Sequence, residues 1–189
     1  MNDIITPQAH KNIITRGLPK TGQITSYELG DDGEHEAGWW VGRLNVNNRQ
    51  RWIAETIAGD DIVIDRATGL MWAGDATAAG CNNGAVLGWT DALLSIVALN
   101  AGAGFAAFFD WRLPNLKELI SIFNYIAPAP LIEEPPFENT FSADYWTSTT
   151  NVAPTNEAYH ISFATAWVNS KPKDGGPFSY RIRCVRKGV

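Results

Sequence analysis

Four carboxylates between residues 133 and 144 are the side chains best suited to acid–base chemistry. They are Glu133, Glu134, Glu138 and Asp144. Glycoside hydrolysis needs two carboxyl groups held a set distance apart across a cleft. Acids along a proline-rich stretch such as residues 127–140 are commonly just solvated. Solvation is the simpler interpretation, so we expect no catalytic residue here.

The sequence contains few side chains that could bind a metal ion or act as a catalytic nucleophile. The sequence holds three histidines, His10, His35 and His160, and we expect neither a metal site nor a cofactor from them. His160 alternates with apolar residues of a predicted strand, which favours a place on the strand surface. The chain lacks a nucleophilic-serine elbow and a phosphate-binding loop.

The two cysteines, Cys81 and Cys184, are too few for a disulfide framework or a zinc site. Cys184 falls on the apolar side of the last predicted strand, so we expect it to be buried. A bridge to Cys81 would close a long loop and stabilise the fold. The sequence leaves both a bridge and two free thiols open.

Aromatic, amide and basic side chains near the C-terminal end are candidates for ligand binding. They are Asn151, Asn156, Trp167, Asn169, Lys171 and Lys173. A ring can stack on a sugar, while amide and ammonium groups hydrogen-bond hydroxyls or anionic groups. Residues 171–189 carry six basic residues and one acid. A solvated strand face would also explain that charge, and Trp167 could instead pack in the core.

Composition limits the class of protein. With 189 residues, 45% hydrophobic and 19% charged, the chain is globular, and its net charge of −5 does not favour nucleic acid. Residues 92–109 are uncharged, but Gly102 and Gly104 interrupt them, so we expect no membrane insertion. Residues 1–20 lack the basic start and apolar core of a secretory signal, and the compartment stays unknown.

The segment around Trp111 predicts a turn that leads into a helix. Pro114 disfavours a helix running through from upstream. Asn115 is a strong N-cap residue, and Glu118 three positions later completes the spacing of a capping box. Asp110 and Arg112, on either side of Trp111, could form an ion pair.

The remaining patterns predict a mixed α+β domain with two helices and a twisted, mainly antiparallel sheet. A hairpin is expected over residues 62–72, with Gly69 in its turn, and a helix over 92–99 capped by Thr90 or Asp91, with Val97 on its buried face. Strands are expected over 145–149, 159–163, 166–168 and 178–186. We expect residues 1–60 to be a β-rich extension or arm and residues 61–189 to be the main domain.

Five motifs resemble, in order, those of the Lcl C-terminal domain family. They are Asp65-x-x-Thr68-Gly69-Leu70-Met71-Trp72, Trp89-x-x-Ala92-Leu93, Asp110-Trp111-Arg112-Leu113-Pro114-Asn115-x-Lys117-Glu118-Leu119, Tyr145-Trp146-Thr147-Ser148-Thr149 and Arg183-Cys184-Val185-Arg186. The resemblance implies a C-type-lectin-like fold and a bacterial surface or phage-related protein, with a trimer possible by analogy. We expect structural roles for Trp72, Asp110, Trp111, Arg112, Asn115, Glu118, Trp146 and Cys184.

The functional expectation is a non-enzymatic recognition or adhesion module that binds a glycan or other surface ligand through loops, at residues 127–140, 151–156 and 169–177. The usual calcium-dependent sugar motifs are absent: Glu133-Glu134-Pro135-Pro136 and Tyr145-Trp146-Thr147 stand in their places. One alternative is a relative of the formylglycine-generating oxidoreductases, which need a pair of reactive cysteines. Another is a purely structural subunit of a larger particle.

Overall fold

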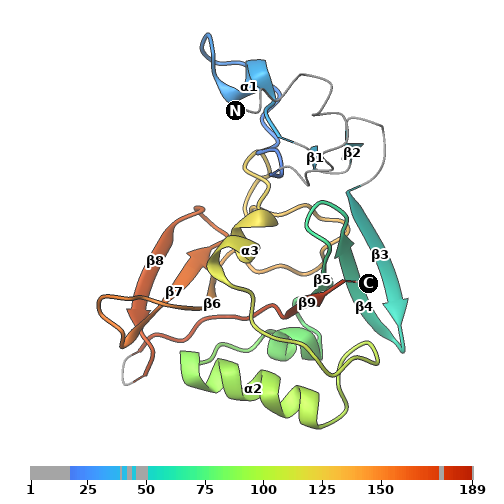
Figure 1. Ribbon diagram of the computed structural model, residues 1–189, viewed down its shortest axis with the longest axis vertical. Helices are drawn as coiled ribbons and strands as arrows, with labels where there is room; N and C mark the ends of the chain where they lie inside the picture. Colours follow the sequence, from blue (N-terminus) through green and yellow to red (C-terminus); the bar gives the residue numbers. More distant parts are fainter. Residues whose placement is uncertain (1–17, 39, 42–43, 46–50, 175–176, 189) are drawn as a thin grey trace, which may run out of the picture.

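The computed structural model describes residues 18–38, 40–41, 44–45, 51–174 and 177–188 of the chain, so His10 lies outside the described residues. The mixed α+β class is confirmed, with most strands divided between a four-stranded and a three-stranded antiparallel sheet (Figure 1). The short elements outside these sheets are α1 (Asp32–His35), β1 (Trp40–Val41), β2 (Leu44–Asn45) and a 3₁₀ helix, η2 (Ala79–Gly84).

The four-stranded sheet has the order β3 (Trp52–Ile57), β4 (Asp60–Asp65), β5 (Leu70–Ala73) and β9 (Val185–Lys187). The predicted hairpin is β4–β5, and Gly69 takes a φ of 73° in its turn, a conformation that favours glycine. The predicted strand 178–186 shrinks to β9. Strand β3 pairs with β4 across residue 60, where we expected a domain boundary, and that division stays a prediction.

Both faces of the four-stranded sheet are buried at its inner strands β4 and β5, which explains the unbroken apolar run in β4. Ile62 contributes to a core cluster that also contains buried residues of the helix α2. The next residue, Val63, contributes to a second cluster, together with the fully buried Trp72. Strand β4 therefore sits between two cores. Because both of its faces are covered, its residues 62–64 are all apolar and do not alternate with polar residues.

The three-stranded sheet consists of β6 (Asp144–Thr150), β7 (Glu157–Ser162) and β8 (Val168–Pro172), in that order. Trp146 of β6 lies opposite His160 of β7, and His160 lies opposite Asn169 of β8. Because directly opposite residues share one face of a sheet, these three side chains form a row. Strand β8 is an edge strand of this sheet (Figure 1).

Helix α2 (Trp89–Ala101) is longer than predicted and begins differently. Its N-cap is Gly88, which makes no side-chain capping bond, so neither Thr90 nor Asp91 caps it as predicted. Ala92 and Ile96 are buried, whereas Val97 is 62% exposed. The prediction that Val97 faces the core was therefore wrong. An apolar residue on this helix did not identify the inner face, because the outer face is also apolar.

Helix α3 (Leu116–Ser121) begins with the predicted capping box, in which Asn115 accepts a hydrogen bond from the Glu118 backbone at 2.9 Å. The predicted ion pair between Asp110 and Arg112 is wrong. Asp110 pairs with Arg186 at 2.6 Å, and Arg112 pairs with Glu118 at 2.7 Å. Trp111, between them, is buried, and its indole N–H donates to the backbone carbonyl of Phe105.

Candidate functional site

The edge strand β8 carries two of the candidate side chains, in a stretch that we expected to be a loop. Asn169 and Lys171 alternate along β8, so both point to the same side of the sheet. The backbone N–H of Ser162 donates to the carbonyl of Trp167, one step beyond the last strand pair, and alternation places Trp167 on that side too. With Lys173, which follows β8, we call Trp167, Asn169, Lys171 and Lys173 the β8 face.

Two aromatic rings hold the lysines of the β8 face in place. The ammonium nitrogen of Lys171 lies 5.1 Å from the ring centre of Phe178, and that of Lys173 lies 4.5 Å from Trp89. In the described part of the chain, neither lysine forms an ion pair with a carboxylate. Cation–π contact orders a lysine without neutralising it. Both charges therefore remain available to a ligand.

Trp167 is the most distinctive side chain of the β8 face, because its side chain is 73% exposed. The alternative in which it packs in the core is excluded. Ala166, at φ 60°, lies in the left-handed region and turns the chain just before Trp167. This large aromatic ring, at the start of an edge strand, therefore packs little against the residues that the structure describes.

The structure separates the two remaining candidates from this group. The amide of Asn151 donates to the Ser170 hydroxyl at 3.1 Å, and its oxygen accepts from the Ala153 backbone. Ser170 alternates with Asn169, so Asn151 lies on the opposite side of the sheet. Asn156 is exposed, and its backbone carbonyl accepts from the N–H of Lys173 at 2.9 Å, beside the face.

Sequence reasoning placed His160 wrongly. His160 is only 6% exposed and stacks on Tyr180 with ring centres 4.4 Å apart. Neither of its nitrogens has a hydrogen-bond partner among the residues that the structure describes. Burial lowers its pKa, Lys171 lowers it further, and Asp144, 3.8 Å away, opposes them. Alternation with Ile161 predicted an outward side chain, but both sides of β7 are buried: Ala158 belongs to one core cluster and Ile161 to the other. The contact with Tyr180 leaves no local signal in the sequence.

The four acids considered for acid–base chemistry are dispersed in the fold. Glu133 accepts a hydrogen bond from the Trp52 indole at 3.1 Å, and Glu134 accepts one from the backbone of Thr140 at 2.7 Å. Glu138 borders a separate surface depression beside β3 and β4. Asp144 lies beside His160. Each of the four acids therefore has different contacts, in a hydrogen bond, at a surface depression or beside an imidazole.

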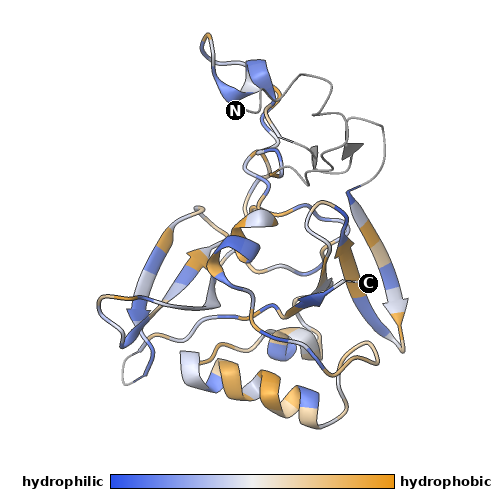
Figure 2. Ribbon diagram, viewed as in Figure 1, coloured by the Kyte–Doolittle hydropathy of each residue, from blue (hydrophilic) through white to orange (hydrophobic). Residues whose placement is uncertain are grey.

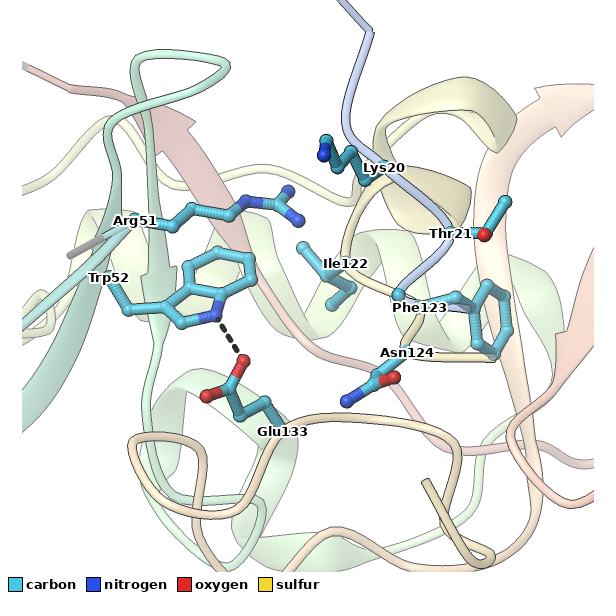
Figure 3. Close-up of a pocket in the computed structure, with 9 residues that line it drawn as sticks. Lys20, Thr21, Arg51, Trp52, Ile122, Phe123, Asn124 and Glu133 are labelled. Atoms are coloured by element: carbon cyan, nitrogen blue, oxygen red, sulfur yellow. Dashed lines mark hydrogen bonds between the residues drawn. The ribbon is translucent and has the colours of Figure 1, made fainter. Parts of the chain in front are cut away.

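A small pocket lies where residues 20–22 meet the main domain (Figure 3). Arg51 forms one wall of the pocket and is only 2% exposed. Its guanidinium forms an ion pair with Asp65 at 2.8 Å, and its guanidinium carbon lies 3.9 Å from the centre of the Trp52 ring. Lys20 and Asn124 line the other side. The cavity volume is about 10 Å³, which suits one water molecule. This pocket is a seam between two segments and is too small for a sugar.

Both cysteines are free and buried, so the open question between a bridge and two thiols is answered as two thiols. Burial raises the pKa of Cys81 and raises that of Cys184 well above its ordinary value. The nearby Arg183 guanidinium lowers each pKa only in part. A thiol is nucleophilic as its thiolate, so these surroundings disfavour reactivity.

Among the residues that the structure describes, no three His, Cys, Asp or Glu side chains gather closely enough to hold a metal ion. No helix in the described segments has the length and apolar character needed to span a membrane. The family model described as the Lcl C-terminal domain matches residues 61–186. A comparison with curated proteins gives no match.

Proposed function

Since the chain belongs to the Lcl C-terminal domain family, we propose that it is a non-enzymatic, lectin-like recognition module that binds a glycan through the β8 face. The proposal places Trp167, Asn169, Lys171 and Lys173 at the ligand. It assigns the rest of the domain the task of holding these side chains in place.

The exposure of Trp167 is the observation that carries this proposal. An indole in solvent loses hydrophobic free energy that burial would recover, and a flat sugar face recovers it by stacking. The ring stands at the start of an edge strand whose backbone pairs with β7, so it is presented from a rigid element. Rigid presentation lowers the entropy lost on binding.

The polar neighbours of Trp167 suit a ligand with hydroxyl and anionic groups. Asn169 offers an amide that can both donate and accept. Lys171 and Lys173 offer unpaired charges, and their aromatic supports, Phe178 and Trp89, limit the rotamers that binding would have to freeze. No step of this recognition requires calcium.

Glycan-array binding in the presence of a chelator tests the proposal. Trp167→Ala is expected to abolish binding, and Lys171→Ala with Lys173→Ala to weaken it at least tenfold, about 1.4 kcal/mol. Lys187→Ala, an exposed lysine on β9, is the matched control and should bind as the parent does. Binding that is absent for the parent, or unchanged in the Trp167 variant, would rule out this face.

A further inference from the structure

Helix α2 carries a second exposed feature that glycan binding does not use. Leu94, Val97, Ala98 and Ala101 point outward at helical spacing, and Leu94 and Val97 are 57% and 62% exposed. We call these four residues the α2 stripe. Figure 2 shows α2 largely orange, and in Figure 1 the helix lies at the end of the molecule away from α1.

The α2 stripe makes this helix apolar on both sides. Ala92 and Ile96 fill the core from its inner side. The outer side of a surface helix is normally polar, and a helix that is apolar all round is normally buried. The described residues leave the outer side uncovered. This contrast indicates an interaction surface.

Charge distinguishes between the possible occupants of the stripe. Helices that lie on anionic membranes carry Lys or Arg along the polar side. Helix α2 has no basic residue, and its sole ionisable side chain is Asp91. An anionic lipid surface would therefore be repelled, and an uncharged protein surface would not.

We infer that the α2 stripe binds the α2 stripe of a second copy of this chain, with the helices antiparallel across a two-fold axis. An interface across a two-fold axis is self-complementary. Here it places Leu94 of one copy against Ala101 of the other, and Val97 against Ala98. Each large side chain then meets a small one, as interdigitating helices require. The two Asp91 carboxylates lie at opposite ends of the pair, so like charges do not meet.

The size of the stripe predicts a weak dimer. A helix of 13 residues spans about 20 Å, so one helix pair buries less than a standard interface of about 1,600 Å². Association should therefore depend on concentration in the micromolar range. The α2 stripe lies on a helix, and the β8 face lies on the three-stranded sheet. Dimerisation and glycan binding therefore use different residues, and each proposal can be wrong without affecting the other.

Sedimentation velocity on the full chain, from about 5 to about 500 μM, tests the interface. The mass should rise from 20.7 kDa towards twice that value. Adding Val97→Glu and Ala98→Glu together should weaken the dimer at least ~100-fold, because like charges would face each other across the axis. Val152→Glu, at an 86% exposed position in a strand turn, is the control and should dimerise normally.

A cysteine placed near the axis gives an independent measurement. Ala98→Cys should form a disulfide-linked dimer with oxidised glutathione, releasing two reduced glutathiones, whereas Val152→Cys should not. Circular dichroism confirms that each variant folds. A parent that stays monomeric at all concentrations overturns the inference. A dimer or trimer that persists after the double glutamate change also overturns the inference. A monomer that binds neutral phosphatidylcholine vesicles through α2 does so as well.

Discussion

The Glu118 carboxylate accepts two hydrogen bonds from the Arg112 guanidinium, each 2.7 Å long. One of its oxygens also accepts the backbone N–H of Asn115 at 2.8 Å. Burial alone would raise the pKa of Glu118, but these hydrogen bonds outweigh it and hold the pKa below its ordinary value. One side chain thus caps α3 and secures the turn that precedes it.

Glu118→Ala should destabilise the fold by about 1–2 kcal/mol, because the helix loses a cap and Arg112 loses its partner. Glu118→Gln keeps an acceptor for the Asn115 N–H and should cost about half as much. Urea denaturation at neutral pH measures both. Lys117→Ala, an exposed neighbour, serves as the reference. Equal stability of the Ala variants at 117 and 118 would contradict a capping role.

His160 should make stability depend on pH in a window separate from that of the carboxylates. Its folded pKa lies below the ordinary 6.5, so the unfolded chain binds protons more readily as pH falls through that value. The contribution of His160 to the free energy of unfolding should therefore be fully present well above pH 6.5 and fall as the pH drops below that value. Urea titrations at several pH values measure it.

His160→Phe should remove the loss of stability in that window, because phenylalanine does not titrate and can still stack on Tyr180. Asp110 and Glu118, whose pKa values are lowered, should still destabilise the variant below about pH 4.5. If the variant loses stability just below pH 6.5 as steeply as the parent does, the loss belongs to other groups.

Arg183 should be among the most sensitive positions. Its buried guanidinium donates to the carbonyls of Ala73 and Gly74, at 2.6 and 2.8 Å, and to the Thr140 hydroxyl. Lys cannot reproduce this planar fork, so Arg183→Lys should cost about 2–4 kcal/mol. Thr140→Ser keeps the hydroxyl acceptor and should cost under about 1 kcal/mol. Thermal unfolding distinguishes the two, and equal melting temperatures would contradict the fork.

The cysteines should resist modification in the folded protein. Burial raises the pKa of both thiols, so alkylation by iodoacetamide should occur only when the chain opens. Mass spectrometry should find two labels in denaturant and none after brief native exposure. A chain that takes no label in denaturant would instead contain a bridge.

Features set by neighbouring residues could be predicted from the sequence. The capping box of Asn115 and Glu118 and the turn at Gly69 each depend on a few adjacent positions, and both are confirmed. Asp110 was paired wrongly because its partner, Arg186, lies 76 residues away. From the sequence, Arg112 was the basic residue nearest to Asp110 in the chain, so we paired those two.

The candidate site shows the same division between local and distant information. Residue type alone singled out Asn169, Lys171 and Lys173, and the strand β8 that carries the first two was expected to be a loop. The rings that hold the lysines, Phe178 and Trp89, come from other segments and were missed. Val97 failed for another reason: an apolar residue marks the core only where the opposite side of its helix is polar.

The burial of β4 and β5 between two cores sets the order in which the chain can fold during synthesis. Arg183 satisfies carbonyls of Ala73 and Gly74 across 110 and 109 residues of sequence, and β9 completes the sheet beside β5. A ribosome that has just released the hairpin must add all those residues before either partner arrives. Until then the edge of β5 and the carbonyls of Ala73 and Gly74 lack these partners, so we expect chaperone capture to compete with folding during translation.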